Sequence, residues 1–88
     1  MKTGIEQISE ERLKQINKHG STLYNNIRGD GKHLLYAAIT YLKAAAGIDI
    51  NSNEWPWDVK YFKDEGYVEN LKKAGALIAA ELDRLNLV

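Results

Sequence analysis

The sequence predicts an all-α protein with three main helices, at about residues 4–18, 32–46 and 65–85, joined by two long loops. Apolar residues recur at helical spacing in each range, and residues that typically start or stop helices bound them. The best strand candidate, Ile48-Asp49-Ile50, alternates in polarity but is too short to build a sheet. With 88 residues, the chain is expected to form one helical domain over 1–88.

The composition is that of a globular chain, with 44% hydrophobic and 27% charged residues. Twelve Lys and Arg balance twelve Asp and Glu, whereas a protein that coats nucleic acid is normally more basic. We therefore expect no long nucleic acid as a partner. The absence of cysteine excludes disulfides and thiolate sites, and two histidines argue against a histidine-rich zinc site. We expect neither a metal nor another cofactor.

The first residues of the sequence lack the apolar region of a signal peptide. No apolar run reaches the roughly 18 residues that would span a bilayer. The sequence therefore predicts no membrane partner and a cytoplasmic location.

The range 4–18 opens with a capping box, in which Thr3 is the N-cap and Glu6 stands three residues further on. Gly20 is a typical stop signal, so the pattern places a loop from 19 to 31. The apolar residues of the range fall on one predicted helical face: Ile5, Ile8, Leu13 and Ile16.

The other two helical ranges have apolar residues on more than one side of the predicted helix. The helix at 32–46 has Asp30 as its expected cap and Gly47 as its stop, and Lys43 is its only charge after His33. The small residues around Gly75 favour close approach of another helix, which would offset the roughly 1 kcal/mol that glycine costs. A heptad-like seam is predicted along the last helix: Val68, Leu71, Gly75, Ile78, Leu82 and Leu85.

This apolar surface exceeds what a three-helix monomer needs, because each of its helices requires only one stripe. A chain of this size also buries only about 60–65% of its extended surface by itself. We therefore expect a homo-oligomer. The alternative is that small alanine side chains are simply tolerated on the surface.

The second loop, 47–64, contains the motif Trp55-Pro56-Trp57. Proline favours the first turn of a helix, so a short helical turn is expected near 56–62, anchored by Trp55, Trp57 and Phe62. These aromatic residues are then a structural anchor. The alternative is that Trp55 and Trp57 form a stacking wall for a planar ligand.

Positive charge is concentrated around the first loop, where residues 18–33 carry three basic residues against Asp30 alone. Lys, Arg and His can bind phosphates, a helix N-terminus adds N–H donors, and an aromatic ring can stack on a base. The candidate ligand-binding residues are Lys18, His19, Tyr24, Asn25, Asn26, Arg28, Lys32, His33, Trp55 and Trp57. The alternative is a solvated basic loop, and no Walker or GxGxxG pattern is present.

Carboxylate pairs offer a second kind of site. Glu6 with Glu10, and Glu65 with Glu69, stand at i and i+4, the spacing with which all-α nucleotide pyrophosphohydrolases hold magnesium. Both pairs also lie in the opening turns of predicted helices, where acidic residues suit the helix dipole.

Four stretches point to a known family: residues 11–16 (ERLKQI), 37–41 (AAITY), 55–57 (WPW) and 70–85 (NLKKAGALIAAELDRL). They are similar to a family of small phage and prophage proteins with an ERxRQI start, an AAxxY helix, a WPW turn and a closing KAGALIxAEIxRL helix. The resemblance covers nearly the whole chain. Because the family is mostly uncharacterised, it implies a phage setting, and hence the host-cell cytoplasm, more than an activity.

The first loop departs from that family. In many members it reads like EGWTxEHD and ends in GEL, whereas residues 19–26 (HGSTLYNN) and 32–34 (KHL) stand at the matching places here. Replacement of acidic positions by His, Asn and Lys disfavours a metal–carboxylate function and favours an anionic ligand.

The resulting hypothesis is a binding protein and not an enzyme. In size, setting and chemistry the chain also resembles sponge proteins that capture nucleotide-derived immune signals, such as cyclic dinucleotides and ADP-ribose derivatives. We predict that it sequesters such a ligand and thereby inhibits bacterial defence. The alternatives are the magnesium enzyme and an inhibitor that binds a host protein through an apolar helix face.

Overall fold

The computed structural model describes residues 1–25 and 32–86, with side chains at 1–17, 32–51 and 53–86. This part of the chain contains three α-helices, α1 (Gly4–Asn25), α2 (Lys32–Ala46) and α3 (Tyr67–Asn86), and two short 3₁₀ turns, η1 (Ser52–Glu54) and η2 (Val59–Tyr61). No described residue belongs to a strand, so the all-α prediction is confirmed. None of the described helices is long and apolar enough to cross a membrane.

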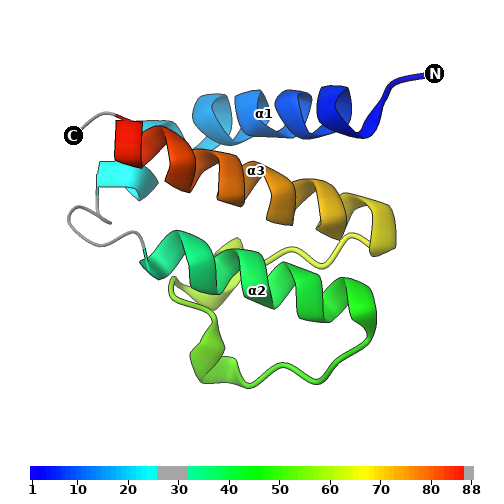
Figure 1. Cartoon of the computed structure of the whole chain (residues 1–88). Helices are drawn as coiled ribbons and strands as arrows, with labels where there is room; N and C mark the ends of the chain where they lie inside the picture. Colours follow the sequence, from blue (N-terminus) through cyan, green and yellow to red (C-terminus); the bar gives the residue numbers. More distant parts are fainter. Residues whose placement is uncertain (26–31, 87–88) are drawn as a thin grey trace.

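The three helices form a flattened arrangement, 36 × 34 × 19 Å, in which α3 lies between α1 and α2 (Figure 1). Helices α1 and α3 begin at the same end of the molecule, and α2 runs in the opposite direction. The segment that contains η1 and η2 crosses back from the end of α2 to the start of α3. Helix α3 therefore packs on both of the other helices.

Helix α1 starts as predicted and ends later than predicted. The Thr3 N–H donates to Glu6 Oε1 (3.0 Å) and the Glu6 N–H donates to Thr3 Oγ1 (3.2 Å), which confirms the capping box. The helix continues through Gly20 to Asn25, so the loop expected from residue 19 was wrong. A lone glycine costs a helix about 1 kcal/mol but removes no backbone hydrogen bond, so it does not by itself end one.

Helix α2 ends at the glycine that the sequence indicated. Gly47 adopts φ 74°, its N–H donates to the Ala44 carbonyl (3.3 Å), and the Ile48 N–H donates to the Lys43 carbonyl (2.8 Å). This pair of bonds is a Schellman motif, which requires a left-handed residue after the last turn. The predicted cap Asp30 lies outside the described residues.

Helix α3 begins at Tyr67, two residues later than predicted, because Gly66 adopts φ 98° just before it. The Asp64 carboxylate accepts the Gly66 N–H (3.2 Å), and the Gly66 carbonyl accepts the Asn70 N–H (2.9 Å). Glu65 therefore precedes the helix and does not form its first turn.

The core lies between α2 and α3. Small side chains let the two helices approach closely, and aromatic residues of the connecting segment close one side of the core. The buried residues of the cluster are Leu34, Ala37, Ala38, Tyr41, Ala74, Leu77 and Ala80; Trp55, Trp57 and Phe62 pack against them. The predicted role of these three aromatic residues as an anchor is confirmed, and η2 is the turn expected near 56–62.

The packed faces of α1 and α3 differ from the predicted ones. Helix α3 buries Asn70, Ala74 and Leu77, whereas the predicted seam leaves its large members between 40% and 58% exposed: Val68, Leu71, Ile78, Leu82 and Leu85. In α1, Glu11 and Gln15 are buried while Ile5, Leu13 and Ile16 are exposed. Gly75 does meet another helix, because Ile8 of α1 packs directly over it.

Candidate functional site

Four aromatic rings pack into one unit, here called the aromatic corner: Tyr41, Trp55, Trp57 and Phe62. Trp55 stands at 87° to both Tyr41 (5.6 Å between centroids) and Trp57 (5.3 Å), and Tyr41 stacks on Phe62 at 5.0 Å. The Trp55 Nε1–H donates to the Asp58 carbonyl (3.0 Å), which fixes the indole orientation. Edge-to-face and offset aromatic pairs contribute about 0.5–1.5 kcal/mol each beyond their buried area.

A cavity of about 670 Å³ lies beside the aromatic corner, between α1, the core helices and the segment leading into α3. This volume is in the range of small-molecule binding sites. We call it the aromatic–lysine cavity. Its lining residues are Glu11, Lys14, Gln15, Tyr41, Trp55, Trp57, Lys60, Tyr61, Lys63, Glu65, Glu69, Lys73 and Leu77.

Three lysines at this cavity, Lys14, Lys60 and Lys63, form no ion pair with any described residue. Helix α1 supplies Lys14, and the segment around η2 supplies the other two. The Lys60 ammonium lies 5.2 Å from the centroid of the Tyr61 ring, a cation–π contact. These three ammonium groups can accept an anion without first breaking an ion pair within the described chain.

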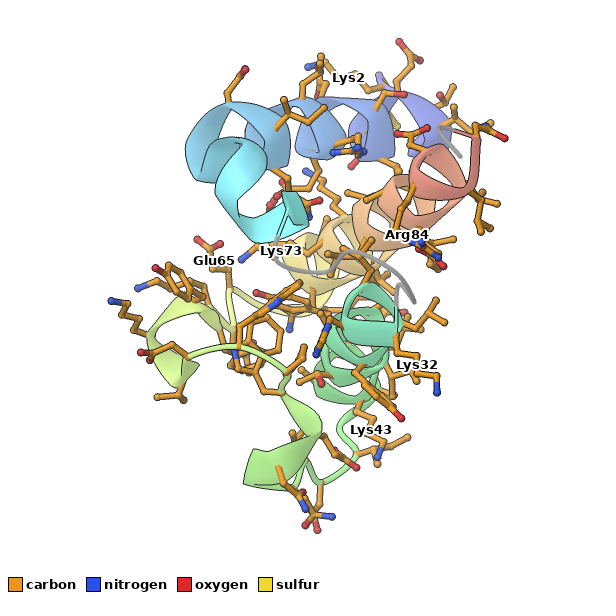
Figure 2. The ribbon with its side chains drawn as sticks, turned by 90° about the vertical axis from the view of Figure 1, so that its left-hand side faces the viewer. Lys2, Lys32, Lys43, Glu65, Lys73 and Arg84 are labelled. Atoms are coloured by element: carbon orange, nitrogen blue, oxygen red, sulfur yellow. The ribbon has the colours of Figure 1, made fainter. Side chains whose placement is uncertain are left out.

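Lys73 has a different role, because it is buried and fully engaged. Its ammonium donates to the Lys63 carbonyl (2.9 Å), pairs with the Glu65 carboxylate, and lies 5.3 Å from the Tyr41 ring centroid. Figure 2 shows Lys73 and Glu65 directed toward one another between α3 and the preceding segment. Lys73 therefore ties the cavity wall to α3.

Glu11 and Gln15, one turn apart on α1, close the cavity on the other side. The Gln15 Nε2 donates to the Lys73 carbonyl (3.5 Å). Glu11 is 8% exposed, and this burial raises the pKa of its carboxyl, while the positive charges of Lys14 and Lys73 act in the opposite direction. Burial likewise raises the pKa of Tyr41, whose hydroxyl accepts the Lys63 N–H (3.3 Å).

The indole N–H of Trp57 is buried at the cavity wall and has no hydrogen-bond acceptor among the described residues. An unsatisfied buried donor costs about 1–3 kcal/mol. Trp57 is therefore a candidate contact for an acceptor atom of a bound molecule.

The structure brings together only part of the predicted site. Trp55 and Trp57 line the cavity, whereas Lys32 and His33, in the first turn of α2, do not. In Figure 2 Lys32 lies away from Glu65 and Lys73. Four other predicted residues belong to the last turns of α1, with side chains outside the described part: Lys18, His19, Tyr24 and Asn25. Asn26 and Arg28 lie outside the described residues altogether.

Sequence reasoning missed the lysines that do line the cavity. Residues 34–63 are balanced in charge when counted as one block, and this count hides Lys60 and Lys63, which lie within and directly after the aromatic-rich residues 55–62. Their alternation with Trp57, Tyr61 and Phe62 was the available signal, because basic and aromatic residues interleave in many nucleotide-binding surfaces.

The four carboxylates of the magnesium alternative are each engaged. Glu6 belongs to the capping box, Glu10 pairs with Lys2, and Glu65 pairs with Lys73. Glu69 pairs with Lys72 (3.1 Å). Among the described residues, no group of three or more His, Asp or Glu is arranged to hold a metal ion.

No family model, curated protein or solved structure matches the chain. The fold and the cavity define a small all-α protein whose cavity is lined by both aromatic side chains and lysines.

Proposed function

We propose that the chain is a binding protein that holds a nucleotide-like anion in the aromatic–lysine cavity. The observation that carries this proposal is the combination of a rigid aromatic wall with Lys14, Lys60 and Lys63, which form no ion pair with described residues. A base stacked on an aromatic side chain contributes about 1–3 kcal/mol, and ammonium groups suit phosphate oxygens. The cavity volume accommodates a ligand of nucleotide size.

The charge balance of the cavity favours an anion. Four lysines face three glutamates, and of these glutamates Glu65 and Glu69 are paired with Lys73 and Lys72. Burial raises the pKa of Glu11, which favours its neutral form more than that of an exposed glutamate. Lys18, His19 and Arg28, whose side chains lie outside the described part, remain candidates for further phosphate contacts.

The biological role that we propose is sequestration of a nucleotide-derived immune signal, such as a cyclic dinucleotide or an ADP-ribose derivative. The resemblance of the sequence to small phage proteins supports a setting inside a bacterial host cell. In that setting the protein inhibits defence by lowering the free concentration of the signal. We further propose that it acts as a homo-oligomer.

Native mass spectrometry with a panel of cyclic dinucleotides and ADP-ribose tests the proposal. The double variant Lys60→Ala/Lys63→Ala is expected to lose at least about tenfold in affinity, since a hydrogen bond to a charged group contributes about 1.5–3 kcal/mol. Lys2→Ala/Lys43→Ala removes the same charge outside this cavity and should bind like the wild type. Retention of no panel member, or equal affinity in both double variants, would remove the proposed site.

The fate of the ligand separates the alternatives. A binding protein returns the nucleotide intact after denaturation. Magnesium-dependent conversion to products would instead favour the enzyme, and a host protein retained without any nucleotide would favour the inhibitor.

A further inference from the structure

Several large apolar side chains are exposed on α2 and α3. A shallow groove connects Ile39, Leu42 and Ile48 at the α2 side with Tyr67 and Leu71 of α3. Leu35 lies one turn before Ile39, and Ile78 and Leu82 follow Leu71 by seven and eleven residues, which places them along the same side of each helix. We call Leu35, Ile39, Leu42, Leu71, Ile78 and Leu82 the α2–α3 apolar face; each is 40–58% exposed.

This face and the aromatic–lysine cavity lie on different sides of α3. Leu71 is two residues from both Glu69 and Lys73, which at 3.6 residues per turn puts it about 160° around the helix from the cavity wall. The groove and the cavity share no lining residue among those described. A molecule that covers the face therefore leaves the cavity open.

The face has the size of a stable protein interface. With Tyr67, Val68 and Leu85 at its edge, its exposed fractions correspond to roughly 800 Å², against about 800 Å² per partner in a standard interface and 300–600 Å² for the largest patch of a typical monomer.

The chemistry of the face fits a second copy of the same chain. Its six residues carry no charge, so they require no oppositely charged partner. Helices that lie on membranes normally add Lys and Arg on their polar face, whereas the one charged residue of the described groove, Lys43, is paired with Glu54. Leu71, Ile78 and Leu82 are spaced by seven and four residues, so they form one exposed row along α3 that can pack against the same row of a second copy.

We propose that a second copy of this chain covers the α2–α3 apolar face, forming a dimer with two-fold symmetry. A two-fold interface uses the same patch on both subunits, so an uncharged, seam-like patch is complementary to itself. The dimer places the two cavities on its outer sides, where each binds its ligand independently. This inference specifies the self-association proposed above and does not depend on the identity of the ligand.

Sedimentation velocity at micromolar concentration tests the interface. We expect a dimer for the wild type and a monomer for Leu71→Glu/Ile78→Glu, because two buried carboxylates would oppose their counterparts across the symmetry axis. Ile5→Glu/Leu13→Glu makes the same chemical change at exposed positions of α1 and should remain dimeric. A monomeric wild type, or a dimeric Leu71→Glu/Ile78→Glu variant, overturns the proposal.

Two further measurements keep the outcomes distinct. If circular dichroism shows that the glutamate variant is unfolded, Leu71→Ala/Ile78→Ala replaces it and should raise the dimer dissociation constant at least tenfold; an unchanged constant overturns the interface. Native mass spectra of the same samples report ligand binding separately. A dimer without nucleotide contradicts only the proposed ligand, and a nucleotide-binding monomer contradicts the interface and the proposed homo-oligomer but not the ligand.

Discussion

At the scale of single residues, the buried amide of Asn70 organises the entry into α3. Asn70 is 1% exposed, its Nδ2 donates to Asp64 Oδ1 (2.9 Å), and its Oδ1 accepts the Glu65 N–H (3.3 Å). Both ends of the amide are thus satisfied by the segment before the helix. That segment also carries Lys63 and Glu65, so Asn70 holds one wall of the cavity in place.

Asn70→Ala is expected to lower the free energy of unfolding by about 1–3 kcal/mol, because it leaves the Glu65 N–H without its acceptor and removes a buried amide. Urea denaturation followed by circular dichroism measures the change. Asn53→Ala, at an exposed position of η1, is the matched control and should stay within about 0.5 kcal/mol of the wild type. Equal effects of the two substitutions would show that the Asn70 contacts contribute nothing.

At the scale of elements, the crossing of α1 and α3 depends on the absence of a side chain at Gly75. A Cβ at this position would lie 2.6 Å from Ile8 Cδ1 and 2.9 Å from Ile8 Cγ1, which is closer than packed atoms approach. The glycine therefore has a packing role in the middle of a helix, where it would otherwise be unfavourable.

Gly75→Ala is expected to destabilise the protein by up to about 2 kcal/mol, since overpacking costs about 1–3 kcal/mol and the better helix propensity of alanine returns at most about 1 kcal/mol. In an Ile8→Ala background the clash is absent, and the same substitution should be neutral or stabilising. A double-mutant cycle of thermal denaturation measures this coupling. Identical effects of Gly75→Ala in both backgrounds would contradict the contact.

At the scale of the whole molecule, carboxylates couple stability to pH in two opposite directions. Three of them have a lowered pKa because a neighbour donates to the ionised form: Thr3 to Glu6, Lys43 to Glu54 and Asn70 to Asp64. Each of these three carboxylates stabilises the folded state at pH values above its ordinary pKa. This stabilisation is lost as the pH falls through the lowered pKa. Glu11 acts in reverse, because burial raises its pKa and the folded state binds its proton more tightly.

The raised pKa of Glu11 determines how this residue changes stability with pH. Stability decreases as the pH rises from the ordinary value of 4.5 through the raised value, because ionisation is less favourable in the folded state. Glu11 also faces Lys14 and Lys73, which favour ionisation, and Glu65 and Glu69, which oppose it. Glu11→Gln should therefore become progressively more stable than the wild type as the pH rises above 4.5.

Melting temperatures measured from about pH 4 to about pH 8 test this dependence. Glu10→Gln changes the net charge equally at an exposed neighbouring position and serves as the control. A constant difference between Glu11→Gln and the wild type across this range would mean that burial does not perturb the Glu11 carboxyl.

Local signals in the sequence determined much of the fold. The Thr3–Glu6 capping box and the Gly47 stop act within a few residues of backbone, so they form wherever the helix forms. The anchoring by Trp55 and Trp57 was also predictable, because large aromatic residues in a short connection bury against whatever core lies nearest. These features, and the all-α class, need no information about neighbouring elements.

Only the tertiary structure decided which faces are buried and which charges meet. Helix α3 packs through Asn70, Ala74 and Leu77 because it lies between two helices, and the more apolar seam beside them stays exposed. Lys14 and Lys63 are 49 residues apart in sequence and line one cavity only because the tertiary structure places α1 and the segment before α3 at the same cavity. Periodicity shows that a helix has an apolar side, but the direction of that side is set by its partners, and those contacts are long-range.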